Sequence, residues 1–143
     1  MRLKIRIAVQ LVSLALILAC PTVEADVVAV VSSKSAVTAL TKSQVADLFL
    51  GRSIRFPGGM QAVPIDRDEG TRAREEFYAA FTGKSPAQVK SYWAKMIFTG
   101  RGQPPRSVAS DAEVRKILEA NPQAIAYVER GALDSGLRVL AEP

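Results

Sequence analysis

The chain has 143 residues, with 19 Lys and Arg against 14 Asp and Glu, one cysteine and no histidine. This composition leaves no Cys/His metal set and excludes an intramolecular disulfide. No nucleophile elbow surrounds Ser32, Ser33 or Ser35. The sequence therefore predicts a protein that is not an enzyme, with no catalytic residue, no metal and no cofactor.

The N-terminus has the pattern of a secretory signal peptide. Arg2, Lys4 and Arg6 precede an apolar run over residues 7–19, and the sequence turns polar at Pro21. The run is shorter than the ~20 apolar residues that a bilayer-spanning helix needs. Val23-Glu24-Ala25 presents small side chains at its first and third positions, as a signal peptidase requires, so we expect residues 1–25 to be removed and the protein to be periplasmic.

A second interpretation of the same segment is a lipoprotein signal. Residues 17–20 read Ile-Leu-Ala-Cys, a loose match to the site at which bacterial lipoproteins are cut and acylated on cysteine. In that case Cys20 would anchor the protein to a membrane.

The remaining residues, 26–143, are about 118 in number, which fits one domain. Without the three basic residues and Glu24 of the first segment, 16 basic residues face 13 acidic ones. This excess is small and interspersed, which argues against a nucleic-acid partner and is compatible with a small anion.

The first half of the domain reads as a strand, a helix, a loop and a second strand. Residues 26–31 are β-branched and continuously apolar, as in a strand buried on both faces of a parallel sheet. Thr41 and Gln44 form a capping box for a helix that Gly51 ends. A basic loop with Pro57-Gly58-Gly59 follows and leads to a strand over 61–66.

The second half contains three helices and two strands. One helix follows Thr71; a second begins at Ser85 with a capping box and Pro86, and a third begins at Ser110. The second helix carries an apolar stripe that indicates core packing, at positions Val89, Tyr92, Trp93, Met96 and Ile97. After the third helix, strands are expected over 124–128 and 137–140. Alternating strands and helices predict a three-layer α/β sandwich.

The most informative segment is the expected strand-to-helix turn at residues 62–81. A helix N-terminus presents unpaired backbone N–H groups and the positive end of the helix dipole, which together can hold an anion. The candidate oxyanion-binding residues are Arg67, Gly70, Thr71 and Arg72. The alternative is an ordinary turn whose arginines pair with the neighbouring carboxylates.

Four segments in order resemble one lobe of a type 2 periplasmic solute-binding protein, and most of all the phosphate-binding component of phosphate ABC transporters. They are residues 27–31, 40–52, 63–77 and 121–128. The third is similar to the family's Arg-Asp-Glu-Gly-Ser-Gly-Thr-Arg segment and the fourth to its Pro-x-Ala-Ile-Gly-Tyr-Val strand. The resemblance implies phosphate or a similar oxyanion as ligand and a link to an ABC transporter.

Two departures from the family pattern bear on the ligand. Complete proteins of this class close two lobes over the ligand, whereas about 118 residues make only one. In the glycine-rich motif, Arg72 replaces a glycine and Ala73 replaces a hydroxyl residue, so Arg72 either blocks the anion or supplies donors to it.

Two further partner interpretations remain open. A homodimer would restore a cleft between two lobes. Alternatively, the lobe has left transport and serves as an interaction module for an envelope protein or a membrane, through the basic loops at 52–57 or 101–106.

Overall fold

The computed structural model describes residues 26–143. The expected signal peptide, its cleavage site and the alternative anchor at Cys20 lie outside the described residues.

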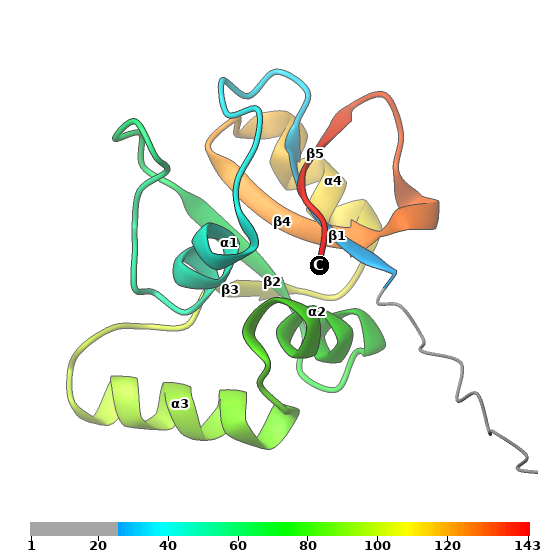
Figure 1. Cartoon of the computed structure of the whole chain (residues 1–143). Coiled ribbons are helices and arrows are strands. Elements are labelled where there is room, and N and C mark those ends of the chain that lie inside the picture. The colour runs from blue at the N-terminus through cyan, green and yellow to red at the C-terminus, as the bar shows by residue number, and fades with distance from the viewer. Residues whose placement is uncertain (1–25) are drawn as a thin grey trace, which may run out of the picture.

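A single five-stranded sheet runs through the centre of the domain (Figure 1). Its strands are β1 (Val27–Ser32), β2 (Val63–Arg67), β3 (Arg106–Val108), β4 (Ala124–Glu129) and β5 (Leu137–Ala141). Their spatial order is β3-β2-β4-β1-β5. Strand β2 is parallel to both β3 and β4, whereas β1 is antiparallel to both β4 and β5, so the sheet is mixed.

Four helices begin and end close to the positions that the sequence predicts. They are α1 (Lys42–Phe49), α2 (Arg72–Thr82), α3 (Pro86–Phe98) and α4 (Asp111–Ala120); a 3-10 turn, η1 (Arg130–Ala132), follows β4. The capping boxes at Thr41 and Ser85 are both complete, with side chain and backbone bonded in each direction. These local hydrogen bonds satisfy amides that a helix start would otherwise leave without partners.

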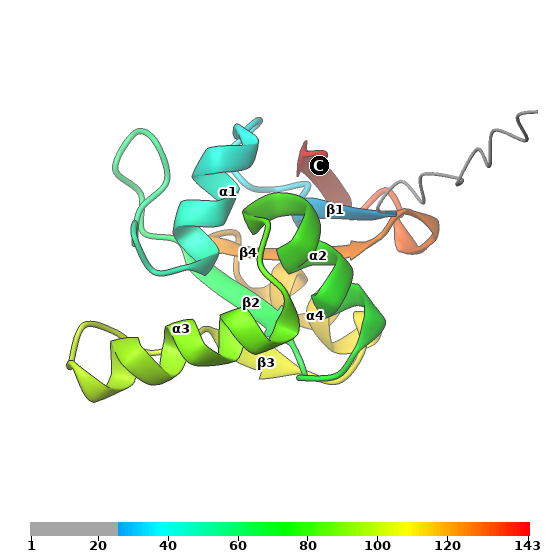
Figure 2. The ribbon, with the colours of Figure 1, turned by 60° about the horizontal axis from the view of Figure 1, so that its bottom comes forward.

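The helices cover both faces of the sheet, which makes three layers (Figure 2). Alternate residues of β1 point to opposite faces: Val27, Ala29 and Val31 pack in a core with α1 and α2, and Val28 and Val30 pack in a core with α4. The three-layer α/β sandwich predicted from the sequence is therefore confirmed.

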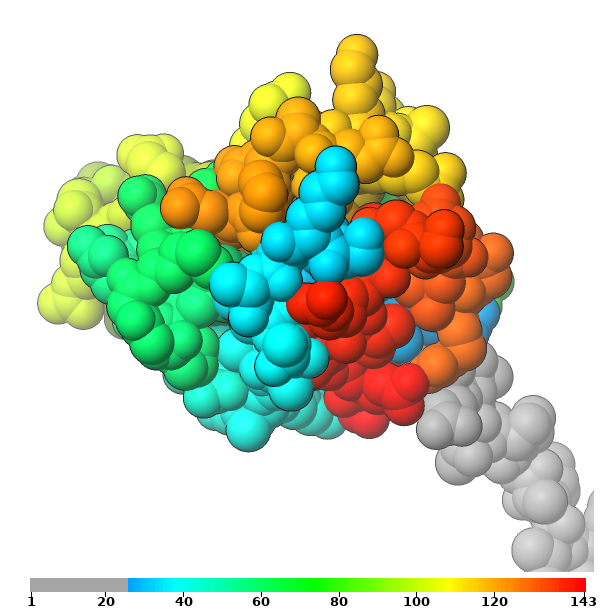
Figure 3. All heavy atoms as spheres, turned by 90° about the horizontal axis from the view of Figure 1, so that it is seen from above, coloured from blue at the N-terminus to red at the C-terminus, as the bar shows by residue number. Residues whose placement is uncertain are grey.

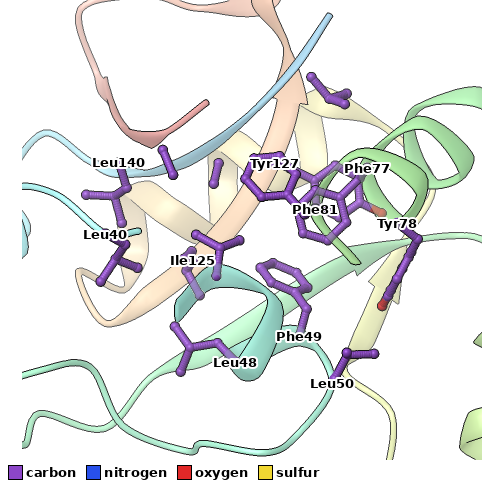
Figure 4. Close-up of a cluster of buried hydrophobic side chains, with 14 of the residues drawn as sticks. Leu40, Leu48, Phe49, Leu50, Phe77, Tyr78, Phe81, Ile125, Tyr127 and Leu140 are labelled. Atoms are coloured by element: carbon purple, nitrogen blue, oxygen red, sulfur yellow. The ribbon is translucent and has the colours of Figure 1, made fainter. Parts of the chain in front are cut away.

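The larger core contains a group of aromatic rings between α1, α2 and β4 (Figure 4). Phe77 stacks on Tyr127 with ring centroids 3.9 Å apart, and Phe49 meets Phe77 edge-on at 4.6 Å. Such ring pairs add to the free energy gained from burying their area. They fix α2 on the strand that lies beside β2.

The loop after β1 is held against the other edge of the sheet. The guanidinium of Arg138, on β5, donates to the carbonyl oxygens of Ser33, Ser35 and Val37 at 2.8–3.2 Å. In Figure 3 this loop, in cyan, lies directly beside the red C-terminal strand. The end of the chain therefore closes the domain on this side.

Three sequence-based expectations need correction. Strand β1 is buried on both faces as expected, but its neighbours run antiparallel to it. Strand β3 was not anticipated, because its residues Arg106–Val108 follow two prolines and are too few to show a pattern. Ile97, expected in the core, is 48% exposed.

Within residues 26–143, none of the helices has the length and apolarity needed to cross a membrane.

Candidate anion-binding site

The carboxyl ends of β2 and β3 lie together at the edge of the sheet where a ligand site is expected. The two strands are parallel, and each leads within a few residues into a helix: β2 into α2 on one face and β3 into α4 on the other. The Asp68 amide donates to the Val108 carbonyl at 3.1 Å and holds the two turns together. In open α/β sheets, ligands bind in the crevice where consecutive connections leave on opposite faces.

Arg67, the last residue of β2, lies at this switch point and is buried. Its guanidinium donates to the carboxylate of Asp111, in the first turn of α4, and to the Ala109 carbonyl at 3.2 Å. Its Nε is buried and has no hydrogen-bond partner within the described part of the chain. The positive charge of Arg67 is therefore largely shielded from water at this edge of the sheet, and the Asp111 carboxylate pairs with it.

Gly70 and Thr71 form the turn that starts α2. Gly70 has φ +85°, a conformation that favours glycine. The amide and the hydroxyl of Thr71 both donate to the Asp68 carbonyl, at 3.2 and 2.8 Å. The hydroxyl therefore braces the turn and does not cap the helix, although Thr71 occupies the N-cap position.

The amides around this turn remain available. Over residues 26–143, the backbone N–H groups of Gly70, Arg72 and Ala73 have no acceptor. They carry the positive end of the α2 dipole. A crevice of only about 10 Å³ lies beside Gly70 and is lined also by Arg74, Glu75 and Tyr78. It has room for about one water molecule, so an anion would bind on the open surface of the turn.

Arg72 points away from Arg67. Its side chain is 74% exposed and its Nε donates to the Glu76 carboxylate, one turn along α2. This carboxylate raises the pKa of Arg72. The structure therefore brings Gly70 and Thr71 together, places Arg67 at the start of α4, and leaves Arg72 on the outer surface of α2.

Sequence reasoning missed a buried polar cluster directly behind this edge. Asp66 is 2% exposed, and its carboxylate accepts from the Tyr78 hydroxyl at 2.7 Å, the Tyr127 hydroxyl and the Arg67 amide at 2.8 Å. Arg74 Nε completes the shell at 3.4 Å. The only available signal was a carboxylate directly after the apolar residues 63–65 of the strand.

Burial and the Asp66 charge shape the protonation of this cluster. Burial, and then the negative charge of Asp66, raise the pKa values of Tyr78 and Tyr127 far above the ordinary tyrosine value. Burial, the largest single effect, lowers the pKa of Arg74, but the Asp66 carboxylate and the two tyrosines together raise it above the ordinary arginine value. Both tyrosines therefore stay protonated and donate to Asp66, which fixes the end of β2.

Chemically, the edge offers backbone amides, a helix dipole and one buried guanidinium, a set suited to a small oxyanion. Within residues 26–143, no group of three or more Cys, Asp or Glu side chains is arranged to hold a metal ion.

Solved structures with a similar fold include proteins named for phosphate transport or phosphate binding. A protein described as a phosphate ABC transporter substrate-binding protein from Clostridium perfringens, solved with bound phosphate, superposes with a TM-score of 0.64 at 14% identity. It is matched over 80% of this chain and 44% of its own. The fold is that of one lobe of a phosphate-binding protein.

Two further solved structures superpose on this chain over less than half of their own length. An ABC-type phosphate transport receptor from Vibrio cholerae gives a TM-score of 0.62 at 17% identity, over 82% of this chain and 48% of the receptor. PstS from Borrelia burgdorferi gives 0.53 at 16% identity, over 81% of this chain and 46% of its own. The chain thus spans less than half the length of these proteins. No protein-family model and no curated protein sequence matches it.

Proposed function

We propose that this protein is an exported, single-lobe relative of solute-binding proteins that binds phosphate or a similar oxyanion at the start of α2. The ligand contacts are the amides of Gly70, Thr71 and Arg72, the Thr71 hydroxyl and a guanidinium, that of Arg67 or Arg72. Thr71 would donate to the anion in exchange for its bonds to the Asp68 carbonyl. The protein carries out no reaction of its own and works beside a phosphate ABC transporter.

One observation carries this proposal: within residues 26–143 the amides of Gly70, Arg72 and Ala73 have no acceptor, at the start of the helix that follows β2 and its last residue, the buried Arg67. The likeness to proteins named for phosphate binding supports the choice of ligand. Because one open lobe leaves the ligand in contact with water, the affinity is far below that of a receptor that closes two lobes.

Asp111 has a defined part in this proposal. Its carboxylate already accepts from the Arg67 guanidinium, so it holds the place that an external oxyanion would take. An incoming phosphate must either displace this carboxylate or bind beside it, where two negative charges repel. The Asp111 carboxylate therefore weakens anion binding.

The test is calorimetric titration of the protein with inorganic phosphate and sulfate. Thr71→Ala removes a ligand hydroxyl and should cost about 1–3 kcal/mol of binding free energy. Asp111→Asn should strengthen binding, because the anion then no longer competes with a carboxylate for the Arg67 guanidinium. Lys34→Ala, on the exposed loop after β1, is the matched control and should leave the affinity unchanged.

Arg72→Gly separates the two roles that Arg72 can have. If Arg72 supplies donors, the glycine variant binds less tightly; if it blocks the backbone, the glycine variant binds more tightly. The proposal would be contradicted if neither phosphate nor sulfate gave a heat of binding with the parent protein or with any of these variants.

The second candidate is an envelope interaction module derived from a binding-protein lobe. Ile54, in the basic loop 52–57, is 67% exposed, and an exposed apolar side chain among arginines has the composition of an interface. A homodimer that completes the cleft belongs to the first candidate. Light scattering during the titration distinguishes them, since a dimer that forms only with phosphate supports a restored cleft.

A further inference from the structure

Helix α3 is packed on one side only. Of its thirteen residues, Val89 and Trp93 alone are buried, and the Tyr92 hydroxyl donates to the Leu50 carbonyl at 2.6 Å. In Figures 1 and 2 the helix lies outside the sandwich, beyond α2. Much of its surface therefore faces away from the domain.

The outward face of α3 ends in an exposed aromatic side chain. Ala87, Ser91, Ala94 and Phe98 are all exposed and follow one another at intervals of four, three and four residues, which places them on one stripe. Phe98 is 92% exposed, and Ile97 beside it is half exposed. An exposed phenylalanine next to an exposed isoleucine costs free energy in water and gains it when covered.

The same segment is purely cationic. Residues 77–110 contain no Asp or Glu and five basic residues, Lys84, Lys90, Lys95, Arg101 and Arg106. The rest of the described domain holds eleven basic and thirteen acidic residues, so the positive charge of the domain is concentrated here. We call the exposed part of residues 84–106 the α3 surface.

Most of these cations have no partner in the described chain. Lys90 alone makes an ion pair, with Glu69 at 3.8 Å, and both side chains are largely exposed. Lys84 lies over the Tyr92 ring at 5.4 Å. A shallow hollow along the outside of the helix is bounded by Lys84 at one end and Lys95 at the other.

Charge decides what covers this surface. A second copy of the chain would bring Lys90 and Lys95 against the same lysines and meet repulsion. An anionic bilayer instead neutralises each cation and accepts the apolar side chains between its headgroups.

We propose that the α3 surface docks on an anionic lipid bilayer, with Phe98 and Ile97 inserted at headgroup depth and Lys84, Lys95 and Arg101 against lipid phosphates. This inference does not depend on the oxyanion site at α2. The oxyanion contacts lie at the start of α2, near the N-terminal end of α3, where Lys90 pairs with Glu69. The inserted side chains Phe98 and Ile97 lie at the opposite end of α3, so the two kinds of binding separate experimentally.

The first experiment is sedimentation of the full chain, as purified from the cells that produce it, with vesicles of phosphatidylcholine alone or mixed with phosphatidylglycerol. The protein should bind the mixed vesicles, and high salt should weaken the binding. Lys95→Glu should reduce affinity at least tenfold, on the order expected for reversing one juxtamembrane charge. Lys34→Glu changes net charge equally on a remote loop and should have a much smaller effect.

The second experiment reports on depth and is insensitive to whatever the N-terminal segment does. Phe98→Trp should show blue-shifted fluorescence and quenching by brominated lipid when mixed vesicles are added. Lys34→Trp should show neither change. Because position 98 is almost fully exposed, neither variant should affect folding.

Several results would overturn the proposal. They are equal binding to neutral and anionic vesicles, equal losses for Lys95→Glu and Lys34→Glu, or a Phe98→Trp signal that vesicles leave unchanged. Inorganic phosphate that competes the protein off the vesicles would assign the contact to the α2 site and would equally reject the α3 surface.

Discussion

Asp66 shows how one residue determines the geometry of the candidate site. A buried carboxylate is costly unless hydrogen bonds and charge compensate it. Tyr78 from α2 and Tyr127 from β4 both donate to Asp66, and Arg74 supplies the opposite charge. The end of β2, the start of α2 and the middle of β4 are therefore joined at one point, and Arg67 follows directly from it.

The raised pKa values of these tyrosines predict a loss of stability at high pH. In the unfolded chain, Tyr78 and Tyr127 ionise near the ordinary value of 10.0, whereas in the folded chain both stay protonated well above it. Their contribution is complete below pH 10 and is lost as the pH rises, at about 1.4 kcal/mol per pH unit for each tyrosine. Urea unfolding between pH 9 and 11 should show this slope.

The matched variants for that measurement are Tyr78→Phe and Tyr127→Phe. Each lowers stability at pH 8 by removing a donor to Asp66, and each should reduce the steepness above pH 10 by about half. A double variant with the same slope as the parent protein would show that other groups cause the alkaline loss.

At the scale of the elements, helix ends are set by short local signals. Gly51, Gly83 and Gly100 follow α1, α2 and α3 and have φ values between +66° and +69°. Only glycine adopts this conformation without a steric cost. Gly51 has a second constraint, because Trp93 from α3 lies against it and a Cβ there would come within 3.2 Å of the indole ring.

Comparing two glycine variants separates these constraints. Gly83→Ala meets only the backbone cost, roughly 1–2 kcal/mol, since no atom lies near the added methyl group. Gly51→Ala should cost more, by about 1 kcal/mol or above, because the methyl group also displaces the buried Trp93. Thermal unfolding of both variants measures the difference between their losses of stability. Equal losses would mean that Trp93 and α3 shift at no cost to accommodate the added methyl group.

At the scale of the whole molecule, the domain is a closed unit. Both faces of the sheet are covered and the last strand ties down the first loop. The local capping signals, the strand patterns and the two cores all agree with one architecture, which favours cooperative folding.

We therefore expect residues 26–143 to fold alone. Circular dichroism should show a single cooperative melt for this fragment. A gradual, non-cooperative loss of signal would mean that the lobe needs a second lobe or a partner to fold.

The sequence alone determined the parts of this protein that depend on neighbours along the chain. Capping residues at 41 and 85, stop glycines and β-branched runs predicted all four helices and four of the five strands, and their alternation predicted the layers. The motif resemblance also identified the lobe, because such motifs are local strand-to-helix turns.

Only the tertiary structure decided how these parts combine. The direction of β1 depends on which strands flank it, and its apolar sequence suits either direction. The pairing of Arg67 with Asp111 joins residues 44 positions apart, and the Asp66 cluster spans 61 positions. Spacing along the chain carries no information about such contacts. Only the packed structure therefore shows the amides without acceptors at the start of α2, the pairing of the Arg67 guanidinium and the uncovered face of α3.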